Sequence, residues 1–139
     1  MSTTMPATRG TPVIYIVDDE ESVRKGLSRL MRSAGIPYRD FASAEQFLAE
    51  MDPQQEGCVL LDITMPGLTG LQLQSELKKR KIRLPIIAVS ARDDADTSSR
   101  ARQLGARFFL RKPVDDQALL DAIHWVLEDE RHLPTTNTK

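Results

Sequence analysis

The sequence of 139 residues contains a single cysteine, few aromatic residues and no long hydrophobic run. One cysteine cannot form an internal disulfide, so the chain suits a reducing compartment and we expect it in the cytoplasm. Cys58 lies in an apolar stretch, which predicts a buried structural thiol. No apolar run approaches the roughly 20 residues that a membrane helix needs. A net charge of −1 gives no electrostatic attraction to nucleic acid or anionic lipid, so we expect the chain to bind neither.

Both ends of the chain are polar. Residues 1–11 contain Pro6 and Gly10 and lack the apolar stretch of a signal peptide, so we interpret them as a disordered lead-in. Residues 131–139 have the character of a tail or linker. The chain is 40% hydrophobic and 28% charged, which is typical of a globular protein, and residues 12–130 have the length of one domain.

Apolar segments alternate with amphipathic segments along this domain. Short apolar runs predict strands at residues 13–17, 36–41, 58–61, 85–89 and 107–110. Helical spacing predicts helices at about residues 23–34, 43–50, 71–81, 94–104 and 115–130, the second of them capped by Ser43. Strands that alternate with helices form a parallel sheet covered on both faces, and right-handed crossovers then favour a doubly wound α/β fold. Such folds place their sites at the carboxyl ends of the strands.

Polar groups stand at four of these five strand ends. Asp18-Asp19 follows the first strand, Asp62 ends the third, Ser90 ends the fourth and Lys112 follows the fifth. Because a doubly wound sheet brings its strand ends together, we expect three carboxylates, a hydroxyl and an ammonium group at one edge. Each residue alone also has a structural interpretation, as a helix cap, a turn former or a solvated lysine. Their combination favours a site.

Phosphoryl transfer to a carboxylate is the chemistry that fits this combination. Like charges about 4 Å apart cost roughly 4 kcal/mol per pair at an effective dielectric constant near 20, so three carboxylates need a cation. Mg²⁺ prefers a few carboxylates together with water and phosphate oxygens. Aspartate is a known nucleophile in such chemistry. Mg²⁺, Lys112 and the Ser90 hydroxyl would each hold one oxygen of the transferred group.

Four motifs together resemble the receiver domain of two-component response regulators, in the right order and with plausible spacing. They are Val17-Asp18-Asp19-Glu20, Leu61-Asp62-Ile63-Thr64-Met65-Pro66-Gly67, Val89-Ser90-Ala91 and Phe109-Leu110-Arg111-Lys112-Pro113. The resemblance covers residues 12–130. The segment 41–48 is similar in particular to the FixJ-type branch, which often continues into a helix-turn-helix DNA-binding domain. The resemblance implies a flavodoxin-like sheet of five parallel strands in the order 2-1-3-4-5, with five helices.

The resemblance also implies roles for individual residues at the site. Asp62 matches the position of the phosphoacceptor. The implied Mg²⁺ ligands are Asp18, acting through a water in many relatives, Asp19, Asp62 and the backbone carbonyl of Thr64. Lys112 would pair with an oxygen of the phosphoryl group.

A second set of implied roles concerns signalling away from the site. Ser90 and Phe109 match the pair that couples phosphorylation to the far face: the hydroxyl moves toward the phosphoryl group and the ring turns inward. Thr64 and Arg92 occupy two variable positions that tune the lifetime of the phosphoryl group. The bond between Lys112 and Pro113 is expected to be cis, as in relatives.

The implied function is signalling rather than enzymatic turnover. The chain would accept a phosphoryl group from a sensor histidine kinase, with only slow self-phosphorylation and autodephosphorylation of its own. The fourth helix has only Ala95, Ala101 and Leu104 as apolar residues, so it is a weakly anchored element. We expect phosphorylation to expose a surface around this helix and the last strand, for a homodimer or an output partner. A solvated surface of mixed charge is the alternative.

Three other functions are compatible with parts of the sequence. A phosphatase of the haloacid-dehalogenase type also uses an aspartyl phosphate, but it needs a second aspartate where Thr64 stands. A flavodoxin-like cofactor binder needs a phosphate-cradling loop after the first strand, where this chain has Asp-Asp-Glu-Glu. A degenerate receiver would act as a phosphorylation-independent interaction module, which the intact set of site residues disfavours. The chain is therefore interpreted as a stand-alone receiver or as the receiver part of a DNA-binding response regulator.

Overall fold

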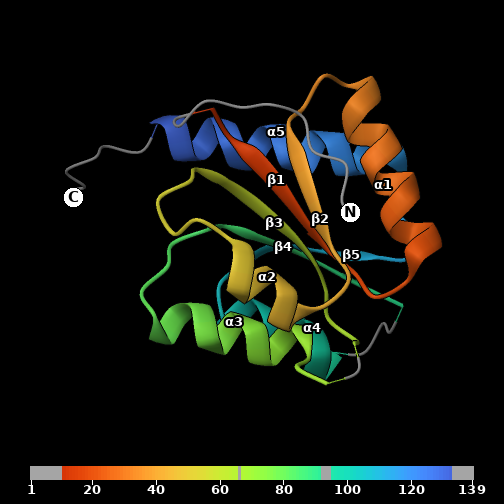
Figure 1. The fold of residues 1–139 in the computed structure, drawn as a ribbon. Coiled ribbons are helices and arrows are strands. Elements are labelled where there is room, and N and C mark those ends of the chain that lie inside the picture. The colour runs from red at the N-terminus through yellow and green to blue at the C-terminus, as the bar shows by residue number, and fades with distance from the viewer. Residues whose placement is uncertain (1–10, 66, 92–94, 133–139) are drawn as a thin grey trace.

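The computed structural model describes residues 11–65, 67–91 and 95–132, with side chains described up to Glu128. The strands are β1 (Val13–Val17), β2 (Tyr38–Phe41), β3 (Gly57–Asp62), β4 (Ile86–Ser90) and β5 (Ala106–Arg111). The helices are α1 (Glu21–Ser33), α2 (Ala44–Glu50), α3 (Gly70–Lys79), α4 (Ala95–Gln103) and α5 (Asp116–His132). Strands and helices alternate along the chain and build one sheet between two layers of helices (Figure 1).

The sheet is parallel and its strand order is β2-β1-β3-β4-β5, which confirms the predicted doubly wound α/β fold. The chain crosses from one half of the sheet to the other between β1 and β3, which pair directly with Val17 opposite Leu61. Asp18 and Asp62 come immediately after these two paired residues. The switch point of the sheet therefore lies between the first acidic motif and the predicted phosphoacceptor.

Helices α2, α3 and α4 cover one face of the sheet, and α1 and α5 cover the other (Figure 1). Successive strand residues point to opposite faces, so each strand contributes to two cores. Val59 and Leu61 are buried under α2, α3 and α4, whereas Leu60 and Ile87 are buried under α1 and α5. Burial on both faces explains why the central strands are continuously apolar in the sequence.

The starts of α2 and α3 follow ordinary capping rules, whereas the start of α1 does not. The Ser43 hydroxyl accepts a hydrogen bond from the amide of Gln46, which confirms the predicted cap of α2. Thr69 and Gln72 form a reciprocal capping box at the start of α3. At α1 the N-cap position belongs to Glu20, whose side chain caps nothing. The structural interpretation of the first aspartates as helix caps is therefore wrong.

All element boundaries lie within two residues of the predicted ones, and two of the differences are informative. β2 begins at Tyr38 rather than at residue 36, because Gly35 and Ile36 form the turn that closes α1 after its last residue, Ser33. Gly35 adopts a positive φ of 71°, and the amide of Ile36 donates to the carbonyl of Met31. α5 continues to His132, beyond residue 130, where the sequence pattern placed its end.

Three further sequence expectations can be compared with the structure. Cys58 is fully buried in the core under α1 and α5, as predicted. The peptide bond between Lys112 and Pro113 is cis. Across the residues that the structure describes, no helix has both the length and the apolar character to span a membrane.

Candidate functional site

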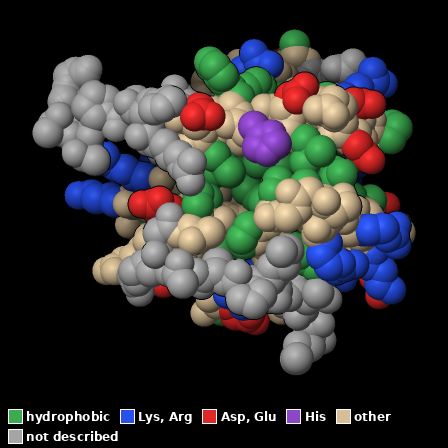
Figure 2. All heavy atoms as spheres, turned by 90° about the horizontal axis from the view of Figure 1, so that it is seen from above, with side chains coloured by type: hydrophobic (Ala, Val, Ile, Leu, Met, Phe, Trp, Pro, Cys, Tyr) green, Lys and Arg blue, Asp and Glu red, His purple; other side chains and the backbone are tan. Residues whose placement is uncertain are grey.

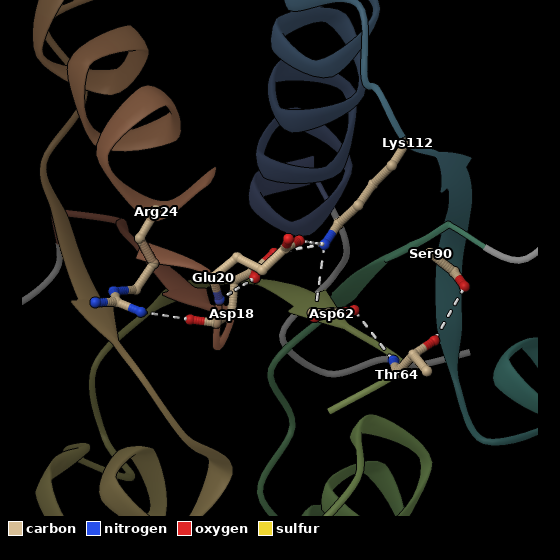
Figure 3. Close-up of polar contacts among 7 residues, drawn as sticks. All are labelled: Asp18, Glu20, Arg24, Asp62, Thr64, Ser90 and Lys112. Atoms are coloured by element: carbon tan, nitrogen blue, oxygen red, sulfur yellow. Dashed lines mark hydrogen bonds and ion pairs between the residues drawn. The ribbon is translucent and has the colours of Figure 1, made fainter. Parts of the chain in front are cut away.

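The carboxyl ends of the strands bring the predicted site residues together at one edge of the sheet (Figure 3). Asp18 follows β1, Asp62 ends β3, Ser90 ends β4 and Lys112 follows β5. Asp18, Asp62 and Ser90 are buried, with 2%, 4% and 0% of their surface exposed. Buried carboxylates are rare unless they are paired or hydrogen-bonded, so their partners decide what this edge can do.

Lys112 is the counter-ion of the acidic cluster. Its Nζ lies 3.0 Å from Asp18 Oδ2, 3.5 Å from Asp62 Oδ2 and 3.2 Å from Glu20 Oε1. The first two contacts are shielded from water, whereas the Glu20 side chain is 58% exposed and its attraction is screened. The sequence pattern did not predict this contact of Glu20.

The electrostatics of the cluster act most strongly on Asp62. Burial raises the pKa of Asp62 to about 7, and the neighbouring charge of Asp18 adds to the shift. Lys112 and the Thr64 amide act in the opposite direction without cancelling it. For Lys112 itself, burial works to lower the pKa, but the hydrogen bond and charge of Asp18 raise it overall. A carboxyl group that titrates near neutrality beside a firmly charged ammonium is a feature of functional sites.

The acidic cluster fits a hard divalent cation. Asp18, Asp19 and Asp62 each offer one oxygen, and these oxygens lie within 4.8 Å of one another. Asp19 is exposed, so one side of the cluster faces solvent, where a Mg²⁺ ion keeps its water ligands. The charge repulsion that helps to raise the pKa of Asp62 is the repulsion that such a cation relieves.

Neighbouring residues hold the segment of Asp18 in place. The Asp18 carboxylate accepts a hydrogen bond from the Glu20 amide at 2.9 Å, and its backbone carbonyl accepts one from Arg24 Nη1, also at 2.9 Å. Arg24 Nε lies 3.5 Å from Asp40 Oδ2 on β2. Arg24 therefore ties the end of β1 to the neighbouring strand. Nothing in the local sequence distinguishes this arginine from a surface residue of α1.

The segment after Asp62 is held by a close approach of helix α3. A Cβ placed on Gly70 would lie 2.5 Å from the carbonyl oxygen of Asp62 and 2.6 Å from the Cα of Ile63, so only glycine fits there. On the other side, the carboxylate of Glu45 accepts a hydrogen bond from the Leu68 amide at 3.1 Å. Neither residue was predicted to support the site, because each acts from a helix on a separate segment of the chain.

Thr64 connects Asp62 to Ser90. The Thr64 amide donates to Asp62 Oδ1 at 3.1 Å, and its side-chain oxygen lies 3.4 Å from that of Ser90 (Figure 3). The backbone carbonyl of Ser90 accepts from the amide of Lys112 at 2.8 Å, which fixes the lysine segment against β4. The predicted role of the Thr64 carbonyl as a metal ligand stays a prediction. Arg92, the other predicted tuning residue, lies outside the described residues.

Phe109 lies behind Ser90 on the neighbouring strand. It stands opposite Ala88, two positions before the pair formed by Ser90 and Arg111. Its ring is partly buried and packs against the core under α2, α3 and α4. The structure therefore puts the two residues of the predicted switch pair on the same side of the sheet as α4.

A groove runs from the site between α1 and α5. Its volume is about 810 Å³, and it begins at Glu20 and Lys112. A stripe of small and apolar residues of α1 lines one wall, and the segment from Pro113 to Leu119 lines the other. Figure 2 views the molecule from the side of these two helices and shows hydrophobic side chains gathered between them. Gly26 leaves the wall of α1 open, since a Cβ built there meets nothing within 4 Å.

With this geometry established, comparison with known proteins is informative. The chain is 41% identical over 126 residues to the transcriptional regulatory protein TdiR of Thauera aromatica, which covers 91% of this chain and 56% of that protein. It is 36% identical over 110 residues to the transcriptional regulatory protein FixJ of Azorhizobium caulinodans, with 79% and 52% covered. The chain spans about half the length of the curated relatives that it matches.

The fold comparison agrees with the sequence comparison. The solved structure of the response regulator StyR superposes with a TM-score of 0.80 at 43% identity, covering 87% of this chain and 62% of that one. Residues 14–124 match the family described as the response regulator receiver domain. The similarity to FixJ bears out the resemblance to the FixJ-type branch. The chain therefore belongs to the receiver domain family of two-component response regulators.

Proposed function

We propose that this receiver domain accepts a phosphoryl group on Asp62 from a sensor histidine kinase, with Mg²⁺ bound beside it. The observation that carries the proposal is the convergence of Asp62 with two further carboxylates and the Lys112 ammonium at one strand-end edge. A buried nucleophile of raised pKa becomes fully ionised when a divalent cation joins the cluster. The bound Mg²⁺ supplies charge neutralisation for the oxygens of the transferred group.

The chain's own residues perform the transfer by positioning. An oxygen of the Asp62 carboxylate attacks the phosphorus of a phosphohistidine, the bond from phosphorus to the imidazole nitrogen breaks, and the imidazole takes up a proton as it leaves. Lys112 then exchanges its contact with Asp62 for a contact with a phosphoryl oxygen. The Ser90 hydroxyl turns from Thr64 toward another phosphoryl oxygen. The product is an acyl phosphate that stores the signal on Asp62.

This chemistry makes the chain a switch rather than a turnover enzyme. We expect both phosphorylation from a small acyl phosphate and hydrolysis of the aspartyl phosphate to be slow. Residue Thr64 stands where a phosphatase of the haloacid-dehalogenase type has its second aspartate. The Thr64 side chain lies beside Ser90 and has no carboxylate that could exchange a proton with a leaving group. The phosphoryl group therefore persists long enough to change a surface.

Movement of Ser90 carries the signal to α4 and β5. Phe109 follows the hydroxyl inward, and the surface around α4 then binds a second copy or an output partner. Relatives of similar sequence are named transcriptional regulatory proteins, so a DNA-binding output is the partner that we propose for a longer regulator. The receiver as a stand-alone protein would use the same surface on a separate partner.

The groove between α1 and α5 is where we place the kinase. Its lining is mostly apolar and reaches the site at Lys112 and Glu20. A kinase helix that lies in the groove would bring its phosphohistidine close to Asp62. Gly26→Gln should fill the groove and slow transfer from a phosphorylated kinase at least severalfold. Gly26→Ala should leave transfer close to that of the parent, and both variants should react normally with acetyl phosphate. An equal loss of phosphorylation rate with the kinase and with acetyl phosphate would mean that the substitution disturbs the phosphoacceptor site instead of kinase binding.

Phosphorylation by acetyl phosphate tests the function directly. Intact mass spectrometry should show one phosphoryl group on the parent in the presence of Mg²⁺, and none after chelation or in Asp62→Asn. Sedimentation with beryllofluoride should show a higher mass if a dimer forms. If no dimer forms, a pull-down with beryllofluoride should capture an output partner. A parent that stays unmodified would instead make the chain a phosphorylation-independent interaction module. Turnover of phosphomonoesters would favour the phosphatase.

A further inference from the structure

Helix α4 buries few of its described side chains. Ala101 is its only buried residue in the range Ala95–Gln103, and the other side chains are exposed or half-exposed. A single buried methyl group supplies little hydrophobic stabilisation. The position of α4 must therefore depend on other contacts, and one of them is polar.

That polar contact comes from Gln74 on the neighbouring helix α3. Gln74 is 1% exposed, and its Nε2 donates to the carbonyl oxygen of Ala101 at 3.0 Å. The Ala101 carbonyl belongs to the last turn of α4, where carbonyls lack a partner within the helix. The amide of Gly105, which could have reached it, donates to Arg102 instead. Gln74 therefore caps α4 from another helix, at the same residue whose methyl group is buried.

The other half of the Gln74 amide is unsatisfied. Its Oε1 is buried and accepts a hydrogen bond from none of the described residues. The desolvation cost of an unpaired buried acceptor offsets much of the stabilisation that the donated hydrogen bond contributes. The contact thus fixes where α4 lies without holding it strongly. A cavity of about 210 Å³, lined by Gln74 together with Leu104 and Gly105, leaves room for the end of α4 to move.

We propose that Gln74 is a positioning residue of the switch, which holds α4 in its unphosphorylated position and releases it when the signal arrives. The proposal rests on the proposed function, because release needs the phosphoryl group on Asp62. Ser90, at the end of β4, precedes α4 in the chain and lies beside the phosphoacceptor. A weak and position-specific contact lets a small movement there shift the population of α4 positions. Gln74 thereby sets how much phosphorylation is needed to switch the chain.

Gln74→Met tests this role because methionine has a similar volume and cannot donate a hydrogen bond. Without the contact, leaving the resting position costs less, so beryllofluoride with Mg²⁺ should bind roughly two- to tenfold tighter by calorimetry. Amides of α4 should also exchange with solvent faster when no phosphoryl analogue is present. Gln74→Leu provides a second variant with the same expectation, should the methionine variant fold poorly.

Ser28→Ala is the matched control on the opposite face of the sheet. Ser28 lies on α1, is buried, and its Oγ also has no partner among the described residues. Its removal should leave both the beryllofluoride affinity and the exchange of α4 at the parental values. Faster exchange with unchanged affinity in Gln74→Met would reduce Gln74 to a structural contact and overturn the proposal, as would weaker binding. A parent that binds no beryllofluoride through Asp62 would show that the proposed function itself has failed.

Discussion

The side-chain oxygens of Thr64 and Ser90 lie 3.4 Å apart at the ends of β3 and β4 (Figure 3). Ser90 is fully buried and Thr64 is exposed, so this contact joins the solvent side of the site to its interior. Under the proposed function, Ser90 must give up the contact when its hydroxyl turns to the phosphoryl group. Thr64 therefore opposes switching in addition to standing next to the phosphoryl group.

Thr64→Val should make switching easier. Valine keeps the branched shape of threonine but lacks the hydroxyl, so Ser90 loses a partner of the resting state. A separation of 3.4 Å is long for two hydroxyls, and we expect a gain in beryllofluoride affinity of only about two- to threefold. Thr64→Ser keeps the hydroxyl and should resemble the parent. Calorimetric titration of all three proteins with beryllofluoride measures the difference. If the valine variant binds beryllofluoride more weakly than the serine variant, the prediction is wrong.

The residues of the site could be predicted from the sequence because they follow strands that are easily recognised. Asp62 and Ser90 stand at the ends of buried apolar runs, and the parallel topology alone brings such ends to one edge. The contacts of Glu20 and Thr64 could not be predicted in this way. They depend on distances between loops, which no periodicity in the sequence encodes.

The same distinction applies to the fold. The parallel, doubly wound sheet could be predicted because strands and helices alternate along the chain. The end of α1 was not predicted correctly. Ile36 is β-branched and apolar, which is typical of a strand, but its amide closes the helix by donating to Met31. The support given by Gly70 and Gln74 was missed as well, because each acts on a residue outside its own helix. At such positions tertiary contacts determine the structure, and the local sequence pattern does not.

Stability should fall as pH rises through the range where Asp62 ionises. The folded chain holds the Asp62 proton up to about pH 7, whereas an unfolded chain releases it near the ordinary value of 3.8. Between these values the folded state binds more protons, so the free energy of unfolding decreases with pH. Asp62→Asn stays neutral and should be more stable than the parent at pH 8, with the difference shrinking toward pH 4.

Urea unfolding in the presence of a chelator measures this difference. Asp121→Asn, which removes a carboxylate at an exposed position of α5 outside the acidic cluster, is the matched control. Added Mg²⁺ should stabilise the parent at pH 8 because it favours the ionised Asp62. An Asp62→Asn variant whose advantage is the same at pH 5 and pH 8 would mean that the pKa of Asp62 is not raised.

Lys112→Met should weaken the fold and strengthen metal binding. The substitution leaves the buried carboxylates of Asp18 and Asp62 without their ammonium partner, so we expect a loss of about 1 kcal/mol or more at pH 8 without metal. Mg²⁺ should then stabilise the variant more than the parent, because it no longer competes with Lys112 for the carboxylates.

Lys25→Met is the matched control for this lysine. Lys25 pairs with Glu21 on the surface of α1, where both side chains are 68% exposed, so its loss should change stability by less than about 0.5 kcal/mol. Unfolding midpoints over a range of Mg²⁺ concentrations give the comparison. A response to Mg²⁺ that is smaller in Lys112→Met than in the parent would show that the lysine assists metal binding rather than competing with it.

Alanine should have opposite effects at two helical glycines. At Gly26 the added methyl group meets nothing within 4 Å, and alanine favours a helix interior by about 0.5–1 kcal/mol, so Gly26→Ala should stabilise the chain. At Gly70 the methyl group would press on the backbone of Asp62 and Ile63, and overpacking of this kind costs roughly 1–3 kcal/mol.

The glycine pair also separates stability from function. The backbone shift that Gly70→Ala requires displaces Asp62, so phosphorylation by acetyl phosphate should slow even under conditions where the variant remains folded. Gly26→Ala lies outside the phosphoacceptor cluster and should be phosphorylated at the parental rate. Circular dichroism establishes folding, and intact mass spectrometry over time gives the rates. Parental phosphorylation of a folded Gly70→Ala variant would mean that α3 can withdraw from Asp62 without moving it, so the close approach would serve packing alone.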